Sequence, residues 1–145
     1  MKIVVQRVLS ASVAVDNKIV SEIKKGYLLL VGIGAGDTTD DVQRLVNSVL
    51  KMRIFSDAEG KMQHSIGDVD GEILVVSQFT LLANFAKGNR PSFHDAAKPE
   101  IAKPLFEALV EGLKSQLGQK IATGVFAADM QVSLCNDGPV TIILE

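Results

Sequence analysis

The sequence predicts an α/β (α+β) fold, and three observations lead to this prediction. Short apolar segments with strand-like periodicity fill the first part of the chain and recur at its end, whereas two longer segments carry apolar residues at helical spacing. The chain of 145 residues is long enough to bury a core without disulfides or metals. No repeat or linker divides it, so we expect residues 1–145 to form one domain.

The N-terminal part of the chain predicts the centre of a sheet. Residues 2–9 are mostly apolar and predict a first strand, and the alternation in Ala11–Asp16 predicts a second, half-buried strand. A turn at Asp16–Lys18 leads into Ile19–Ile23, which keeps the period of two. The apolar run Tyr27–Ile33 is long enough for a strand that is covered on both faces.

Two segments have the apolar spacing of helices. From Asp40 onward one apolar face is formed by Val42, Leu45, Val46, Val49 and Leu50. Either Thr38 or Thr39 can cap this helix, because both precede its acidic first turn. The second helix carries Leu105, Leu109, Leu113 and Leu117 at intervals of four. We expect Pro104 in its first turn, because deeper in the helix a proline removes a backbone hydrogen bond.

The remaining segments predict strands and one long loop. Glu72–Phe79 predicts a buried strand, and Leu82–Ala97 predicts a loop of the length that is often functional in small domains. Two final strands, Met130–Leu134 and Val140–Leu144, flank Gly138-Pro139, which predicts a turn.

Composition and charge narrow the classes of partner. The net charge of −2 and the pI of about 5.7 argue against a broad nucleic-acid surface, although a single terminal nucleotide needs only a few local donors. Residues 87–90 could supply such donors or form a solvated turn. No apolar run reaches the length of about 20 residues that a membrane span needs. The N-terminus reads as a strand rather than a signal peptide, and the single Cys135 fits a reducing compartment, so we expect a cytoplasmic protein.

Neither a dinucleotide site nor a metal site is expected. Gly32, Gly34 and Gly36 follow a strand, but their spacing departs from G-x-G-x-x-G and the acids that follow would repel a pyrophosphate. We expect them to form a turn with unusual backbone angles. His64 and His94 stand in no ligand pattern, and Cys135 is expected to be a structural thiol, so we expect no metal and no cofactor.

Polar groups are concentrated where one buried strand ends. Ile73–Val76 is apolar on both faces, and Ser77-Gln78-Phe79-Thr80 follows directly. Hydrogen-bonding groups beside a core need partners, which are either backbone groups or a substrate. The G-x-S-x-G pattern of an α/β-hydrolase is absent, and nothing in the spacing of the two histidines suggests a Ser-His-Asp triad.

Two separated segments, Ser77–Leu81 and Asn136–Thr141, resemble the signature pair of the D-aminoacyl-tRNA deacylases. The similarity runs essentially the whole length of the chain and includes Val5–Val8, Met52–Phe55, Gly60–Met62, Arg90–Phe93 and Thr123–Met130. It implies a homodimer with a β-barrel-like sheet flanked by two main helices, and active sites at the subunit interface. It also implies hydrolysis of the ester between a D-amino acid, or glycine, and the 3′ end of a tRNA, as a proofreading step.

The resemblance assigns roles to individual residues. Catalysis is expected from the backbone and side chains of Ser77, Gln78, Phe79 and Thr80. Gly138 and Pro139, joined by a cis peptide, are expected to enter the partner's site, where their carbonyl oxygens read the α-amino group and L side chains are rejected. Phe126 and Met130 are expected to line the pocket for the terminal adenosine, and Arg7 is expected to hold the Gly-Pro loop.

Two mechanisms and one non-catalytic function remain open at this stage. Thr80 could attack as a nucleophile, but no candidate base lies near it in sequence. We favour the route in which Ser77 and the N–H groups of Gln78 and Phe79 stabilise an oxyanion while the substrate's 2′-hydroxyl positions a water. The alternative function is a dimeric module that binds nucleic-acid ends or small amino compounds without turnover, which the balanced charge and the missing acid-base residues favour.

Overall fold

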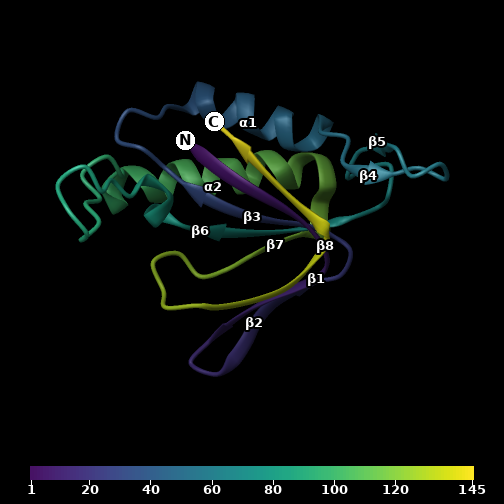
Figure 1. Cartoon of the computed structure of the whole chain (residues 1–145), viewed down its shortest axis with the longest axis horizontal. Coiled ribbons are helices and arrows are strands. Elements are labelled where there is room, and N and C mark those ends of the chain that lie inside the picture. The colour runs from purple at the N-terminus through teal and green to yellow at the C-terminus, as the bar shows by residue number, and fades with distance from the viewer.

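The computed structural model describes residues 1–145, and its architecture is a curved sheet with two helices packed on one face (Figure 1). In chain order the elements are β1 (Lys2–Val15), β2 (Lys18–Ile23), β3 (Gly26–Gly32), α1 (Thr39–Lys51), β4 (Phe55–Ser56), β5 (Met62–His64), β6 (Glu72–Ser77), the 3₁₀ turn η1 (Phe79–Leu82), α2 (Pro99–Leu117), η2 (Gly118–Lys120), β7 (Ile121–Thr123) and β8 (Gln131–Leu144). The predicted fold class is confirmed.

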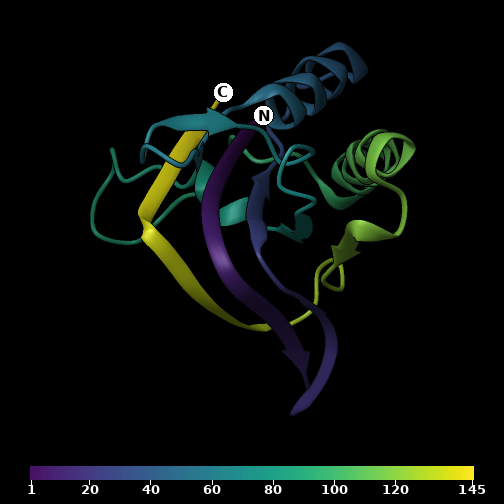
Figure 2. The same cartoon turned by 90° about the vertical axis from the view of Figure 1, so that its right-hand side faces the viewer.

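Six strands form the main sheet in the order β2-β1-β3-β6-β7, and β8 pairs with β1. β1 is antiparallel to β2, β3 and β8, whereas β3, β6 and β7 run parallel to one another. The long strands β1 and β8 bend strongly, so the sheet is nearly closed and barrel-like (Figure 2). The helices α1 and α2 pack against each other over the open face (Figure 1).

The first two predicted strands are one continuous strand, so the prediction of a break after residue 9 is wrong. The register with β8 shifts between Val8 and Ser10, and the alternation of burial slips at the same place. Arg7 and Val8 are both buried, and Leu9 and Ser10 are both exposed. A β-bulge, which bends a strand without ending it, produces this slip in the sequence pattern.

The two predicted C-terminal strands are likewise one strand, β8. Asn136 pairs with Val8 and Thr141 pairs with Gln6, so residues 137–140 lie opposite Arg7 alone. The Gly138-Pro139 step therefore stands in a four-residue bulge rather than in a turn, because pairing with β1 resumes on both sides of it. Sequence periodicity cannot separate such a bulge from a hairpin.

The other elements mostly agree with the sequence predictions. Asp16 and Asn17 make the first turn with positive φ angles of 50° and 63°, as a two-residue hairpin requires. Thr38 is the N-cap of α1, and the buried side chains of that helix are among those predicted. The short strands β4, β5 and β7 were not predicted, because two or three residues carry no readable period.

The second helix begins earlier than predicted. Pro99 is its first residue, so Pro104 lies in the second turn and not in the first. Pro104 and Glu100, whose carbonyl lacks the usual partner four residues on, are both exposed, so water can satisfy that carbonyl.

Apolar side chains cover both faces of the sheet. The larger cluster of 22 buried residues joins the sheet to the helices, and the smaller cluster lies inside the curl and contains Val8, Ala11, Val13, Ile23, Leu28, Leu74 and Val76. β3 and β6 contribute to both clusters, which confirms that they are covered on both faces. Neither long helix has the combination of length and apolar character needed to cross a membrane.

Candidate active site

The C-terminal end of β6 positions the first predicted site segment. Ser77 is the last residue of β6 and lies opposite Val31 of β3. The Gln78 N–H donates to the Val31 carbonyl at 2.7 Å, and the chain then turns into η1. The predicted strand therefore ends two residues earlier than Phe79, because Gln78 makes the last bond to β3.

Gly32 lets η1 approach the sheet closely. A Cβ at this position would lie 2.5 Å from Leu82 Cδ2 and 3.0 Å from the Gln78 carbonyl oxygen. Gly32, Gly34 and Gly36 do not have positive φ, so the prediction that they serve unusual backbone angles is wrong. At Gly32 the absence of a side chain is needed for proximity, which places η1 directly beside Ser77.

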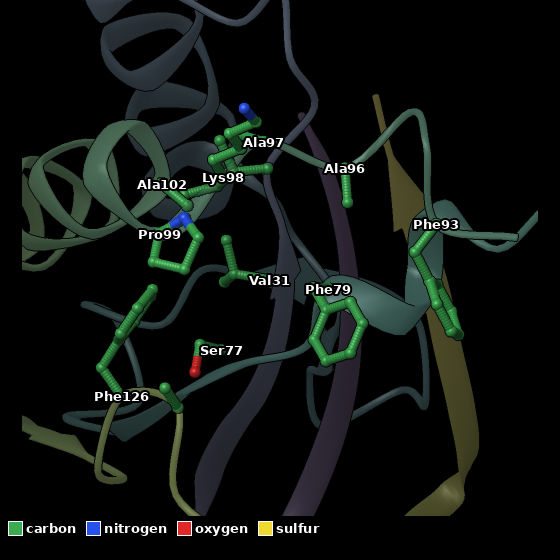
Figure 3. Close-up of a pocket in the computed structure, with 12 residues that line it drawn as sticks. Val31, Ser77, Phe79, Phe93, Ala96, Ala97, Lys98, Pro99, Ala102 and Phe126 are labelled. Carbon is green, nitrogen blue, oxygen red and sulfur yellow. The ribbon is translucent and has the colours of Figure 1, made fainter.

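An apolar cavity of about 390 Å³ opens beside Ser77. Its lining residues are Val31, Ile33, Ser77, Phe79, Phe93, Ala96, Ala97, Lys98, Pro99, Ala102, Phe126 and Ala127. Figure 3 shows the Ser77 hydroxyl in this cavity, with Phe126 on one side and Phe79 on the other. The Phe79 ring packs edge-on against Phe93 at 4.9 Å, and the Phe126 ring packs on Phe106 of α2 at 5.7 Å, so the aromatic walls are held in place.

A second cavity of about 250 Å³ adjoins the first, since Ser77 and Phe79 line both. Met130 lines this second cavity, and its sulfur would lie only 2.7 Å from a Cβ atom at Gly124. Gly124 thus makes room for the Met130 side chain. The structure brings together Ser77, Phe79, Phe126 and Met130, all of which were predicted as site residues.

Three donors around Ser77 have no acceptor in the protein. The Ser77 hydroxyl makes no hydrogen bond, and the N–H groups of Phe79 and Thr80 are free because they begin a 3₁₀ turn. The Gln78 N–H, by contrast, is bonded to Val31. The prediction that the Gln78 N–H stabilises an oxyanion is therefore wrong, and the available backbone donors are one residue further along the chain.

The Thr80 side chain has the wrong surroundings for a nucleophile. It is exposed, lines neither cavity and accepts a hydrogen bond from Gln78 Nε2. An amide donates to the hydroxyl oxygen and cannot take its proton. Asp129 is the only carboxylate that lines either cavity, and no histidine does.

The sequence analysis missed three residues of the site. Asp129 was the unassigned position between Ala128 and Met130, Phe93 belonged to a quoted motif without a role, and Lys98 was assigned to no element or role. The motif Arg90-Pro91-Ser92-Phe93 was the available signal for Phe93.

The second predicted segment is a clamped, exposed loop. Asn136 Oδ1 accepts a hydrogen bond from Val140 N, and Asn136 Nδ2 donates to Thr141 Oγ1, both at 3.0 Å. Gly138 has φ of 133° and, like Pro139, is exposed. The Gly138-Pro139 peptide bond is cis, as the resemblance implied.

The buried side chain of Arg7 holds this loop through Asp137. The side chain is 9% exposed, Nε donates to the Asp137 carbonyl at 3.0 Å, and Nη1 donates to the Ile54 carbonyl. The Asp137 carboxylate lies 3.4 Å from Nε. Tyr27, stacked on Phe55 at 5.1 Å, is buried nearby; burial raises the pKa of its phenol, and the charge of Arg7 partly opposes that rise.

The loop and the Ser77 cavity do not meet within one chain. Ser77 pairs with Val31, and Val31 pairs with Ile3. Arg7 lies further along β1 and pairs with Tyr27, near the other end of β3. The bend in β8 accordingly lies at the opposite end of the sheet from the C-terminal end of β6 (Figure 1). Neither Gly138 nor Pro139 lines either cavity.

The histidines and the cysteine lie outside the cavities. His64 is in β5, His94 is in the loop before α2, and Cys135 is exposed on β8. No three His, Cys, Asp or Glu side chains gather in a group that could hold a metal ion.

Comparisons with known proteins agree on one family. The family model described as D-Tyr-tRNA(Tyr) deacylase matches residues 4–145. The chain is 54% identical over 145 residues to the D-aminoacyl-tRNA deacylase of Flavobacterium psychrophilum and 51% identical to that of Flavobacterium johnsoniae, covering all of this chain and 97% of each relative.

Two solved structures share the fold. One, named c-Myc DNA Unwinding Element Binding Protein, is 43% identical with a TM-score of 0.93, and the match covers 100% of this chain and 98% of that one. The other, described as a probable eukaryotic D-amino acid tRNA deacylase, is 15% identical with a TM-score of 0.87 over 99% and 97% of the two chains. At 15% identity, the second match shows only that the two chains share a fold.

Proposed function

The chain belongs to the D-Tyr-tRNA(Tyr) deacylase family, and from this premise we propose that it hydrolyses the ester between a D-amino acid and the 3′ end of a tRNA. The observation that carries the proposal is a pair of free donors at the edge of an apolar cavity, Ser77 Oγ and the Phe79 N–H, with the Thr80 N–H next to them in η1. Residues 1–145 act as one domain in this proposal. A tRNA substrate is consistent with the cytoplasmic location that the sequence predicts.

The chemistry needs orientation and charge stabilisation more than a strong base. A water attacks the ester carbonyl carbon, and the carbonyl oxygen becomes an oxyanion that accepts hydrogen bonds from Phe79 N, Thr80 N and Ser77 Oγ. The substrate's 2′-hydroxyl takes a proton from the water and gives one to the departing 3′-oxygen as the C–O bond breaks. Fixed donors of this kind suit an ester that is already reactive.

The aromatic walls suit the terminal adenosine. Phe126 and Phe79 flank the Ser77 hydroxyl, and Met130 lies beyond it in the adjoining cavity. A base stacked on an aromatic ring is stabilised by about 1–3 kcal/mol. We place the adenine against these side chains, which puts its ribose and ester at Ser77.

We assign the reading of chirality to the partner's Gly138-Pro139 loop. The loop is exposed and clamped by Arg7 and Asn136, and it lies away from the cavity of its own chain. Backbone carbonyls presented by a clamped loop accept hydrogen bonds from the substrate's α-ammonium group. An L side chain would meet backbone atoms that cannot move aside, whereas glycine has no side chain to exclude, so glycyl-tRNA is also a substrate.

A homodimer follows from this assignment. Three exposed apolar side chains on the two strands that flank the loop, Leu9, Leu134 and Ile143, are available for contact with a partner. Two inactive variants test the arrangement: Ser77→Ala, and Gly138→Val, whose side chain would meet Arg7 and Val140. After subunit exchange, random pairing gives a complete set of residues at about a quarter of the sites, so activity should return to about that level. No recovery despite proven exchange would place both segments in one chain's site.

A second candidate function is binding to nucleic-acid ends without turnover. The likeness to a protein named for binding a DNA unwinding element favours it. Deacylation of D-Tyr-tRNA and L-Tyr-tRNA, measured side by side, separates the two. Turnover of the D-substrate with the L-substrate spared supports the deacylase, and binding of both without turnover supports the second candidate.

A further inference from the structure

A polar hollow of about 430 Å³ lies next to the candidate active site. It is lined by Asn84, Ala86, Lys87, Arg90, Ser92, His94 and Asp95. Residues 92–94 separate this hollow from the Ser77 cavity, because Ser92 and His94 line the hollow whereas Phe93 lines the cavity. A bound strand that leaves the cavity over Phe93 would therefore enter the hollow directly.

The loop that carries the hollow is a built structure. Asn84 and Ser92 form an antiparallel bridge with reciprocal backbone hydrogen bonds of 2.9 Å, and Asn84 Oδ1 accepts a further bond from Ala86 N at 2.8 Å. Gly88 closes the tip with a φ of 126°, and its N–H donates to the Phe85 carbonyl. The tip that bears Lys87 and Arg90 is thus fixed at its base.

The basic groups of this loop have no acidic partner. Lys87 and Arg90 are exposed and belong to none of the protein's eight ion pairs. The protein as a whole carries a net charge of −2, so these two cations form a local feature of an otherwise acidic molecule. Unpaired cations beside a fixed hollow suit phosphate groups.

We propose that this hollow binds the phosphates of the nucleotides that precede the terminal one in the single-stranded 3′ end of the substrate. The inference rests on the proposed function, because that function puts the terminal adenosine in the adjoining cavity. Lys87 and Arg90 contact the phosphates, and Ser92 and Asn84 supply neutral hydrogen-bonding groups. Asp95 is the one carboxylate that lines the hollow, and it repels phosphates. The hollow therefore takes only a few phosphates, on the side of Lys87 and Arg90.

The test compares two substrates that differ in phosphate. D-Tyr-tRNA carries the preceding nucleotides, whereas 3′-D-tyrosyl-adenosine carries the same ester without any phosphate. In the double variant Lys87→Ala/Arg90→Ala, kcat/KM for the tRNA should fall about 5- to 50-fold, the range expected when charge-assisted contacts are lost at an exposed surface. The value for the nucleoside ester should stay unchanged.

Salt dependence gives a second readout. Each phosphate contact on a single strand contributes about 0.7 to the slope of log(kcat/KM) against log salt concentration, so the double variant should lose about 1.4 of that slope. The control Lys51→Ala/Lys114→Ala removes the same charge from exposed positions on α1 and α2, and it should keep both the rate and the slope.

The outcomes separate this inference from the proposed function. A wild-type enzyme that cleaves both substrates, with the double variant equal to the control, would refute the phosphate site and leave the deacylase intact. Equal losses on both substrates would mean that the loop only supports the cavity, which also refutes it. If the wild type cleaves neither substrate, anisotropy titration of a short single-stranded RNA still decides, because weaker and less salt-dependent binding by the double variant supports the site and unchanged binding refutes it.

Discussion

Replacing Arg7 should uncouple the Gly138-Pro139 loop from the sheet. Arg7 makes two charge-assisted hydrogen bonds to backbone carbonyls, those of Ile54 and Asp137. Bonds of this kind contribute about 1.5–3 kcal/mol each, and the lower end applies here because removing the side chain also removes the cost of burying its charge. We therefore expect Arg7→Ala to lower the free energy of unfolding by about 3 kcal/mol.

The chain offers a matched control for this measurement. Arg44 also donates to one main-chain oxygen, that of the last residue, Glu145, and lies beside one side-chain carboxylate, that of Asp41, but its side chain is 52% exposed. Arg44→Ala should cost less than about 1 kcal/mol, because exposed ion pairs contribute little. Urea unfolding at fixed protein concentration compares the two variants directly.

Activity should report on the loop separately from stability. Arg7→Lys keeps the positive charge, but a single ammonium group cannot reproduce the fork that reaches both carbonyls. We expect this variant to fold, to lose about half of the stability that Arg7→Ala loses, and to show a smaller ratio of D-Tyr-tRNA to L-Tyr-tRNA cleavage. An Arg7→Ala loss no larger than that of Arg44→Ala, or an unchanged D/L ratio in Arg7→Lys, would refute this account of the loop.

Three further outcomes follow from the structure. Gly32→Ala should destabilise the protein by about 1–3 kcal/mol and slow turnover because its Cβ displaces η1, whereas Gly36→Ala, with nothing within 4 Å, should leave both the urea midpoint and the rate unchanged. Thr80→Ala should retain activity without any trapped acyl-enzyme, and removing the substrate's 2′-hydroxyl should cost more than this substitution; a mass shift on Thr80 after rapid quench would instead establish the covalent route. Because burial raises the pKa of Tyr27 above its ordinary 10, the folded state holds the proton more tightly, so the contribution of Tyr27 to stability should be constant below about pH 10 and fall above it. Tyr27 is the only tyrosine, so phenolate absorbance should appear together with alkaline unfolding, and a phenolate signal in the folded protein near pH 10 would contradict this.

The sequence predicted the regular part of the fold because that part follows periodicity. The apolar face of α1, the leucine spacing of α2 and the doubly covered strands β3 and β6 all lie where the pattern placed them. The errors in β1 and β8 have one cause. Bulges at Val8–Ser10 and at residues 137–140 shift the phase of the alternation, and a shifted phase looks like the end of a strand.

The candidate site was predictable as a set of residues but not as a set of atoms. Ser77, Phe79, Phe126 and Met130 do line adjoining cavities. Which backbone N–H is free depends on where the ladder to β3 ends, and no residue pattern records that the Gln78 N–H is taken by Val31. Asp129 was missed for a related reason, because it lines the second cavity from the segment between β7 and β8, and no residue pattern records that placement.

The positions of the two signature segments explain why one chain cannot complete the proposed site. Both are fixed to the same pair of buried strands, Ser77 at the level of Val31 and the bulge at the level of Tyr27. β1 and β3 pair without interruption between these levels, and their core residues are almost fully buried, so no local hinge can bring the segments together. In the proposed function, a loop that is held at the far end of its own sheet therefore acts on an ester bound by another copy of the chain. The rigidity that Arg7 and Asn136 give the loop, together with its exposure, is therefore an argument for a site shared between two copies of the chain.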